Sequence, residues 1–213
     1  DTVPGLGSIW GQSGFKITSE KTILAAMFFN SMLVRPFVIY IVPFLYDAYD
    51  IPLLYLCDTP GLFVGPQAEE AALVRHSARI LNAAANSTTP FMTITLRKAY
   101  GLGLYMMGSL PVRPDYYIAW PTAEHGAMGF EGAVKITHKK ELEAIQDPIE
   151  RRDRERELAD KLRDHNTALE VAARYEYDDV IDPSDTRKVI IRFLDALPPV
   201  LPRSDRKRTV DNW

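Results

Sequence analysis

Short apolar runs alternate with segments of helical periodicity along residues 51–120. Residues 51–57 form a continuous apolar run, and runs of this length without alternation are typical of strands buried on both faces. Residues 91–96 are rich in β-branched and apolar side chains, and residues 116–120 form a third such run. Strands separated by helices predict parallel βαβ units with right-handed crossovers, and therefore an α/β fold.

Two helices are expected between these strands. Residues 67–86 carry an apolar stripe at helical spacing, formed by Leu73, Val74, Ile80, Leu81 and Ala84. A glycine-bearing turn over residues 97–103 leads out of the second strand, and the apolar residues 104–110 begin the second helix. Each of the first two strands is therefore expected to end in a loop that contains glycine.

The pattern changes after residue 134, where charged residues become frequent. Residues 139–165 hold 8 basic and 9 acidic side chains, interleaved along the segment. This pattern predicts an exposed helical hairpin, broken at Asp147 and Pro148, with opposite charges pairing along its faces. A basic patch that binds a partner is the alternative, and the nearly neutral balance argues against it.

One more helix is expected near the C-terminal end. Residues 182–187 have the composition of a helix start, with Ser184 or Asp185 as the capping residue. The predicted helix buries a stripe of five apolar side chains, Val189, Ile190, Phe193, Leu194 and Leu197. It ends before Pro198 and Pro199, and a polar tail follows.

The first 50 residues are poor in charge and predict no definite element. Residues 1–14 are rich in glycine and do not show the basic and apolar regions of a secretory signal. Residues 23–46 are strongly apolar, but Arg35 and Pro36 divide them into halves shorter than the ~20 residues of a membrane-spanning helix. We therefore expect this stretch to form buried core or a subunit interface rather than a membrane span.

The composition excludes several classes of function. Of the 213 residues, 46% are apolar and 25% are charged, which excludes wholesale disorder. The 28 acidic residues outnumber the 25 basic ones, for a formal net charge of −3, so a general nucleic-acid binder is not expected. The single cysteine excludes an internal disulfide framework and a cysteine-rich zinc cluster, and it suits a reducing compartment.

The two glycine-bearing loops are the first candidates for a functional site. Residues 61–65 follow the first strand and residues 101–103 follow the second. In an open α/β sheet, ligands collect outside the carboxyl ends of parallel strands. Backbone amides just before a helix have no partner within it, so two such loops side by side would stabilise an enolate or a urea-like anion. The alternative is that these glycines only permit turns.

The side chains indicate no conventional catalytic motif. The four histidines, His76, His125, His138 and His165, lack metal-ligand spacing, and no nucleophile elbow or P-loop occurs. No metal is therefore expected. His125, in a loop over residues 121–126, is the best candidate for a functional histidine, whereas His76 is expected on a polar helix face. Cys57 is expected to pack as a small apolar residue. Arg97 and Lys98 either meet an anion at the strand end or are simply solvated.

Taken together, several motifs resemble the carboxyltransferase component of biotin-dependent acyl-CoA carboxylases. The matching segments are residues 50–61, 64–66, 74–76, 96–103, 119–123, 128–134, 178–183, 186–187 and 211–213. The combination is specific, although no single segment would be. The resemblance extends from about residue 47 to the end of the chain.

The resemblance implies a crotonase-like spiral of ββα units with C-terminal helices. Family chains carry two such domains, and residues 51–213 resemble the C-terminal one, which chiefly receives carboxybiotin. The N-terminal domain, which chiefly binds acyl-CoA, is then expected on a partner chain or a missing segment. Residues 1–50 depart from the family pattern and are treated as a divergent N-terminal segment, apolar and a candidate interface.

The resemblance also implies a mechanism without a side-chain base. Carboxybiotin, carried on a partner's carrier domain, releases carbon dioxide, and the resulting anion takes the α-proton of the acyl-CoA. The thioester enolate then attacks the carbon dioxide. The family's biotin-binding oxyanion hole corresponds to the backbone amides of Leu102 and Gly103. Further contacts to biotin or substrate are expected from Gly61, Phe63, Gly65, Tyr100, Gly101 and Tyr105, with Tyr105 at a position that tunes acyl-chain choice in some members.

The expected partners are an acyl-CoA, a biotin carboxyl carrier or biotin carboxylase subunit, and the N-terminal carboxyltransferase domain. The family's active site lies at a dimer interface, and trimers of dimers are common. Two alternatives remain: a biotin-dependent decarboxylase that runs the same chemistry backwards, and a non-catalytic scaffold subunit. A bacterial cytoplasm is favoured as the location, with the mitochondrial matrix as the alternative.

Overall fold

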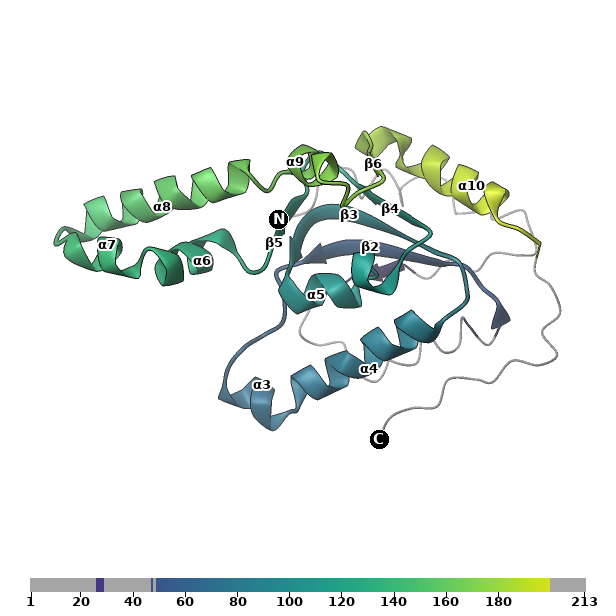
Figure 1. The fold of residues 1–213 in the computed structure, drawn as a ribbon, viewed down its shortest axis with the longest axis horizontal. Helices are drawn as coiled ribbons and strands as arrows, with labels where there is room; N and C mark the ends of the chain where they lie inside the picture. The colour runs from purple at the N-terminus through teal and green to yellow at the C-terminus, as the bar shows by residue number, and fades with distance from the viewer. Residues whose placement is uncertain (1–25, 29–46, 48, 200–213) are drawn as a thin grey trace, which may run out of the picture.

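The computed structural model describes residues 26–28, 47 and 49–199, and it forms a parallel sheet with helices on both faces (Figure 1). The elements in chain order are β1 (Ala26–Phe28), β2 (Leu53–Thr59), α3 (Pro66–Glu70), α4 (Leu73–Asn86), β3 (Phe91–Tyr100), α5 (Gly101–Met106), the 3₁₀ helix η1 (Leu110–Val112), β4 (Tyr116–Ala119), β5 (Glu124–Gly126), α6 (Phe130–Thr137), α7 (Lys139–Ala144), α8 (Pro148–Asp164), α9 (Ala168–Ala173), β6 (Asp179–Val180), the 3₁₀ helix η2 (Pro183–Asp185) and α10 (Thr186–Ala196).

The sheet has the order β1-β2-β3-β4-β6, and β5 pairs with the far end of β3. Every strand pair is parallel, which confirms the predicted βαβ units. Parallel strands bring their carboxyl ends to the same edge of the sheet, so the loops after β2 and β3 become neighbours. All seven residues of β2 are buried, as the continuous apolar run predicts.

The core lies on both faces of the sheet. On one face, Tyr55 and Cys57 pack with side chains from α4, α5 and α9. On the other, Leu56 and Ile94 pack with Trp120 and with the stripe of α10. The predicted α10 stripe is confirmed for its residues 189, 190, 193 and 194, which pack in this second cluster.

The predicted helix over residues 67–86 is wrong as a single element. The chain forms α3 and α4 instead, because Ala72 adopts a left-handed conformation (φ 51°) between them. The buried side of α4 is formed by Ser77, Ile80, Ala83 and Ala84, while the predicted stripe member Val74 is exposed. The buried Ser77 hydroxyl donates to the Leu73 carbonyl, so a polar residue fits on this face.

The second strand continues beyond its predicted end. Residues 97–100, expected as a turn, stay in β3 because β5 gives them a partner, with Lys98 opposite Glu124 and Tyr100 opposite Gly126. The helix expected over residues 104–110 begins earlier, at Gly101, and ends at Met106. The strand therefore passes into α5 without an intervening loop.

The expected cap of the last helix is also wrong. Asp182 accepts hydrogen bonds from the Ser184 amide (2.8 Å) and hydroxyl (2.6 Å), and this turn begins η2. Neither Ser184 nor Asp185 caps α10 with its side chain. The Asp182 carboxylate forms an Asx-type turn, and its hydrogen bonds with Ser184 lower the pKa of Asp182.

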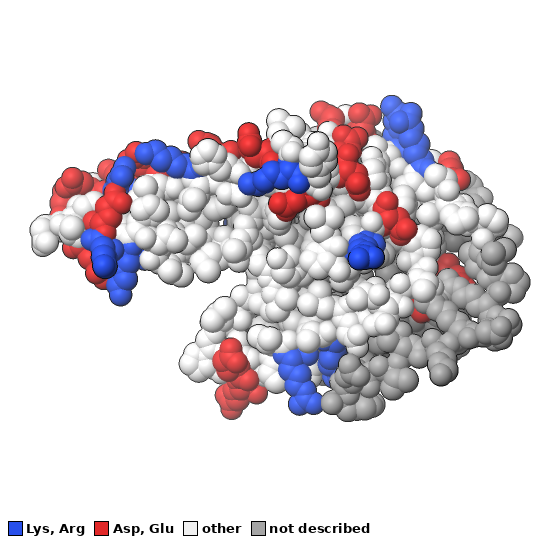
Figure 2. Space-filling model, in the orientation of Figure 1, with Lys and Arg blue, Asp and Glu red and all other residues white. Residues whose placement is uncertain are grey.

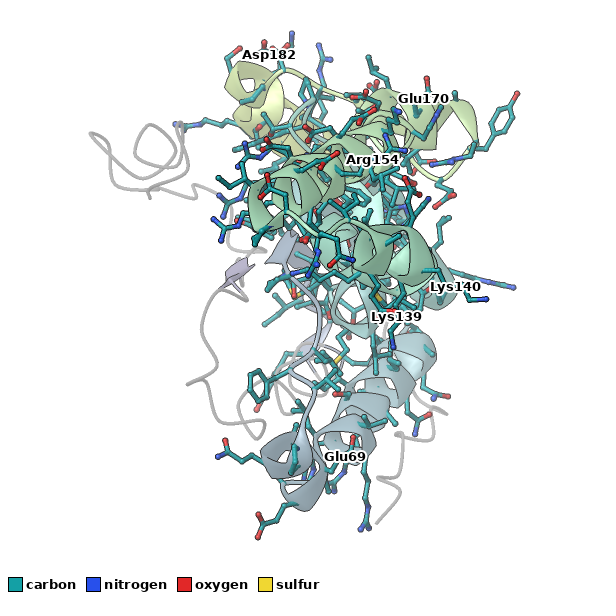
Figure 3. All side chains as sticks on the ribbon, turned by 90° about the vertical axis from the view of Figure 1, so that its left-hand side faces the viewer. Glu69, Lys139, Lys140, Arg154, Glu170 and Asp182 are labelled. Atoms are coloured by element: carbon teal, nitrogen blue, oxygen red, sulfur yellow. The ribbon has the colours of Figure 1, made fainter. Side chains whose placement is uncertain are left out.

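Helices α6, α7 and α8 form an arm that projects from the sheet (Figure 1). The hairpin break predicted at Asp147 and Pro148 is confirmed, and Asp147 caps α8 by accepting from the Ile149 amide at 2.8 Å. The arm has a small core of its own, formed by Phe130, Val134, Leu142, Leu158, Ala159 and Leu162 together with Tyr100. In the view onto the end of the arm (Figure 3), Lys139 and Lys140 on α7 lie apart from Glu69 on α3.

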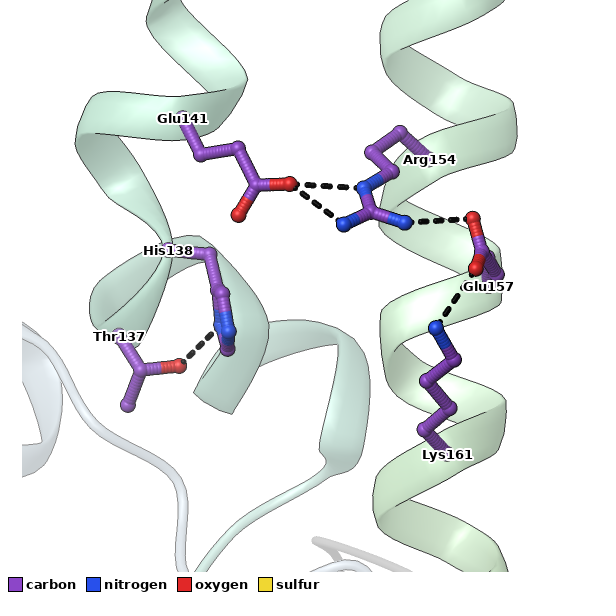
Figure 4. A network of polar contacts seen from close by, with 6 residues as sticks. All are labelled: Thr137, His138, Glu141, Arg154, Glu157 and Lys161. Carbon is purple, nitrogen blue, oxygen red and sulfur yellow. Dashed lines mark hydrogen bonds and ion pairs between the residues drawn. The ribbon is translucent and has the colours of Figure 1, made fainter.

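Opposite charges pair along the arm as predicted. Arg154 links Glu141 of α7 to Glu157 of α8, and Lys161 contacts the second oxygen of Glu157, each at 2.7 Å (Figure 4). The hydrogen bonds from Lys161 and Arg154 lower the pKa of Glu157 to about 2. These pairs are exposed, so they orient α7 against α8 rather than adding much stability.

Several expectations concern residues outside the described ranges. Only β1 represents the apolar stretch of residues 23–46, and it pairs with β2 at the edge of the sheet. The expectations for residues 1–25 and 211–213 fall outside the described part of the chain. Within the described part, no helix combines the length and apolar character that a membrane span requires.

Candidate active site

The two glycine segments predicted as loops meet at the carboxyl ends of β2 and β3, although residues 101–103 form the first turn of α5 rather than a loop. Gly103 in α5 packs so closely on the first loop that an added Cβ atom would lie 2.7 Å from Thr59 Oγ1 and 3.0 Å from Gly61 Cα. The Gly61 amide donates to the same Thr59 hydroxyl at 3.2 Å, and Gly61 has φ 101°. Glycine is required at both positions, at Gly103 by the close approach and at Gly61 by the backbone conformation.

Helix α5 begins directly at this junction. Its first residue, Gly101, has φ 54°, and a Cβ atom there would lie 2.8 Å from the Ala127 carbonyl oxygen. The amides of the first helical turn have no acceptor within the helix, and no side chain caps this end. In the described part of the chain, no hydrogen bond from the Leu102 or Gly103 amide to another segment is found. Both amides lie in the first turn of α5, at the positive end of the helix dipole.

Figure 2 shows a hollow in the surface between the arm and α3. In the same orientation, Figure 1 places α5 at the inner end of this hollow. The visible wall carries few Lys, Arg, Asp or Glu side chains. The segments that border it expose large apolar side chains: Phe63 (52% exposed), Val64, Tyr105 and Met128. Exposed apolar surface of this kind marks a ligand or partner site.

Tyr100, which was expected to contact biotin or substrate, is buried rather than exposed at the surface. Its side chain is 4% exposed, and its hydroxyl donates to Glu124 Oε2 at 2.5 Å. Its ring packs edge-on against Phe130, with ring centroids 5.5 Å apart. Burial, followed by the hydrogen bond with Glu124, raises the pKa of Tyr100 above its ordinary value. No pattern in the sequence pointed to Glu124, because it lies in the three-residue strand β5.

Arg97 pairs with an acidic side chain, so it neither waits for an anion nor is simply solvated. Its Nη2 atom lies 3.1 Å from Asp58 Oδ2, and Asp58 Oδ1 accepts from the Lys98 amide at 3.1 Å. This pair ties the end of β2 to β3 just ahead of the two loops. Neighbouring Cys57 is fully buried, which confirms its expected apolar packing, and burial together with the Asp58 charge raises the pKa of Cys57 to about 12.

His125, the best histidine candidate, is engaged in a structural pair. Its Nδ1 atom lies 3.1 Å from Glu176 Oε2, and its ring lies 6.3 Å from that of Tyr177. His76 is partly buried on α4. Among the described residues, no group of three or more His, Cys, Asp and Glu side chains is placed to hold a metal ion.

Acid is expected to destabilise the fold through His125. Burial lowers the pKa of His125 below 6.5, and this effect outweighs the opposing Glu176 carboxylate. As the pH falls below 6.5, the unfolded chain takes up a proton before the folded one does, so the free energy of unfolding decreases. Urea unfolding at pH 7.5 and pH 5.5 should show a smaller acid loss for His125→Gln than for the unchanged chain. The exposed His165, changed to Gln, serves as the control and should keep the full loss; equal losses in all three proteins contradict the prediction.

The sequence matches the carboxyl transferase domain over residues 43–202, most of the chain. The chain belongs to the carboxyl transferase family. Among solved structures, it resembles a transcarboxylase 12S structure described as a hexamer assembly with methylmalonyl-coenzyme A bound. It has a TM-score of 0.68 and 34% identity, and the match covers 81% of this chain and 33% of that one. The crotonase-like α/β fold expected from the resemblance is therefore confirmed.

Three relatives show the range of the family. The methylmalonyl-CoA carboxyltransferase 12S subunit of Propionibacterium freudenreichii subsp. shermanii is 40% identical over 153 residues, which are 70% of this chain and 28% of that subunit. The propionyl-CoA carboxylase carboxyltransferase subunit of Haloferax mediterranei is 41% identical over 166 residues, 78% of this chain and 31% of its own. The methylmalonyl-CoA decarboxylase subunit alpha of Propionigenium modestum is 37% identical over 151 residues, which are 71% of this chain and 29% of that subunit. This chain spans about a third of the length of these relatives.

Proposed function

We propose that this chain supplies the biotin-side half of a carboxyltransferase that moves a carboxyl group from carboxybiotin to the α-carbon of an acyl-CoA. The observation that carries the proposal is the pair of amides at Leu102 and Gly103, which have no acceptor in another described segment and belong to the first turn of α5, the helix at the inner end of the hollow. Membership of the carboxyl transferase family supports it.

The residues present fit the ureido group of biotin. A ureido oxygen needs hydrogen-bond donors in one place, and the first turn of α5 provides two next to the glycine loop after β2. When bound, carboxybiotin supplies the carboxyl group and, once this has left, the base for the α-proton. The chain's own part is to hold the oxygen and stabilise the negative charge that develops on it, for which one donor contributes about 3–4 kcal/mol.

The exposed side chains around the amides fit the rest of this role. Phe63 and Tyr105 offer apolar surface beside the donors, and Gly65 and Gly101 shape the two loops. Because the donors are backbone groups, the side chain of Leu102 is free to vary without loss of the site. Tyr105 (43% exposed) remains our candidate for a residue that affects acyl-chain choice.

The active assembly is proposed to need partners. The matched segments are 28% and 31% of the two relatives' lengths, so we expect the acyl-CoA half of the site to come from a separate chain or from a further segment of the same protein. A biotin carrier must reach the hollow, and an oligomer built from dimers, with a trimer of dimers as the favoured form, would join the two halves. The hexamer described for the 12S structure supports this arrangement.

Carboxyl exchange in the native assembly tests the proposal. The assembly that contains this chain is supplied with propionyl-CoA, because the relatives from Propionibacterium and Haloferax are named for methylmalonyl-CoA and propionyl-CoA. Labelled carboxyl groups should pass from the carboxylated biotin carrier to the acyl-CoA, and back. No exchange with a series of acyl-CoA chain lengths at saturating carrier contradicts the proposal and favours a non-catalytic scaffold.

A decarboxylase is the second candidate, favoured by the similarity to the methylmalonyl-CoA decarboxylase subunit. The same site would then take a carboxyl group from a carboxyacyl-CoA and pass it to biotin. A membrane partner that couples decarboxylation to sodium transport would accompany the chain in that case. The composition of the native assembly distinguishes the two candidates, since an ATP-dependent biotin carboxylase subunit accompanies only the carboxylase.

A further inference from the structure

Four side chains form a joint between the arm and the end of β3: Tyr100, Glu124, Phe130 and Arg163. Glu124 uses both oxygens, accepting from the Tyr100 hydroxyl with Oε2 and pairing with Arg163 Nε through Oε1 at 3.2 Å. The Arg163 guanidinium lies 5.5 Å from the centre of the Phe130 ring. The carboxylate of Glu124 therefore has a fixed orientation between the strand and the last turn of α8.

Backbone contacts hold the same joint together. The His125 amide donates to the Asn166 carbonyl at 3.0 Å, and Glu124 forms an isolated bridge with Thr167. Residues at the C-terminal end of the arm are thus fastened to β5, and β5 runs beside the last three residues of β3. The arm is connected to the strand end by side chains and by main chain.

Tyr100 lies between this joint and the two amides along the chain. It is the last residue of β3, and α5 begins with the next residue. Gly101 packs against the Ala127 carbonyl, and Gly103 packs against Thr59 and Gly61. These close contacts leave the backbone between Tyr100 and the two amides little room to move. A misplacement of about 1 Å at a reacting group can cost roughly a hundredfold in rate.

We propose that Glu124 is a positioning residue that fixes the Leu102 and Gly103 amides through its hydrogen bond with Tyr100. The inference rests on the proposed function, because it assigns Glu124 a part in the same site. Glu124 does not touch the reacting atoms; its role is to hold the Tyr100 hydroxyl and, with Arg163, to link the arm to the site.

Three variants, measured in the native assembly, show whether Glu124 positions the two amides or only supports the arm. Glu124→Ala removes the acceptor for Tyr100, and Tyr100→Phe removes the donor, so each should lower kcat tenfold or more with KM for acyl-CoA within twofold. Glu124→Gln keeps a carbonyl oxygen for Tyr100 but loses the charge that faces Arg163, and it should stay within threefold of the unchanged protein. Glu155→Ala is the matched control, because Glu155 pairs with Lys135 at 3.1 Å within the arm and contacts no part of the joint.

Amide hydrogen exchange gives a readout that does not depend on activity. Exchange of residues 101–106 should be faster in Glu124→Ala and Tyr100→Phe, and unchanged in Glu124→Gln and Glu155→Ala. The inference is overturned if Glu124→Ala keeps kcat within twofold and exchange unchanged, or if Glu124→Gln is as impaired as Glu124→Ala while Tyr100→Phe is not. If the unsubstituted assembly shows no carboxyl exchange, that result contradicts the proposed function instead. Amide hydrogen exchange would still test whether Glu124 orders residues 101–106.

Discussion

Gly103→Ala is expected to lower carboxyl exchange in the native assembly by about a hundredfold. The new Cβ atom would lie 2.7 Å from Thr59 Oγ1 and 3.0–3.1 Å from the backbone of Gly61, so the first turn of α5 and the loop after β2 must move apart. This displacement misplaces both proposed donors, and roughly 1 Å suffices for an effect of this size. Overpacking also costs about 1–3 kcal/mol of stability, partly offset by the higher helix propensity of alanine.

Gly132→Ala is the matched control for this variant. Gly132 occupies the corresponding third position of α6, and no atom lies within 4 Å of a Cβ placed there. The control should leave activity unchanged and stabilise the fold by up to about 1 kcal/mol. If Gly103→Ala is as active as Gly132→Ala, the close contact between the two loops has no part in the reaction.

Trp120→Phe is expected to reduce the free energy of unfolding by about 2–3 kcal/mol. Trp120 is 1% exposed, and its indole Nε1 donates to Thr186 Oγ1 at 2.9 Å, which joins the end of β4 to the start of α10. Phenylalanine leaves a cavity and removes the donor, and both effects destabilise. Thr186→Val should cost about 1–2 kcal/mol, because it leaves the buried indole N–H without its acceptor.

A double-mutant cycle in urea checks this contact. The double variant should lose about 1 kcal/mol less than the sum of the two single variants, since the hydrogen bond can be lost only once. Thr137→Val is the control, because Thr137 is exposed on α6 and its hydroxyl bonds only within its own helix and to His138. Strict additivity of Trp120→Phe and Thr186→Val would show that the bond between them contributes nothing.

The strands and the arm could be predicted because their signals are local. The continuous apolar run of residues 51–57 and the interleaved charges of residues 139–165 specify burial and exposure residue by residue. The break at Ala72 had no such signal, since alanine is the best helix former and a left-handed conformation for it depends on packing elsewhere. The extension of β3 to Tyr100 likewise depends on a strand of only three residues that pairs from a distance along the chain.

The candidate site likewise combines features that local sequence signals predict with one that depends on the tertiary fold. The glycines of the site could be recognised in the sequence, and the structure explains why they are there. Gly61 and Gly101 have positive φ, and Gly103 packs closely on the segment after β2. Their adjacency followed from the parallel order of β2 and β3. The role of Glu124 could not be predicted, because its partners Tyr100 and Arg163 come from β3 and the end of α8, and only the tertiary fold brings them together.

The Leu102 and Gly103 amides are proposed to act as hydrogen-bond donors to a developing anion, and replacing their N–H groups one at a time is a sharp test of that role. Ribosomal incorporation of the α-hydroxy analogues of leucine and glycine replaces each amide N–H by an ester oxygen while keeping the side chain. The same change at Gly132, the third residue of exposed helix α6, is the control. We expect kcat for carboxyl exchange to fall about 10²–10³-fold with the ester at Leu102 or at Gly103, and to stay unchanged with the ester at Gly132. Full activity of both esters in a folded native assembly would contradict it.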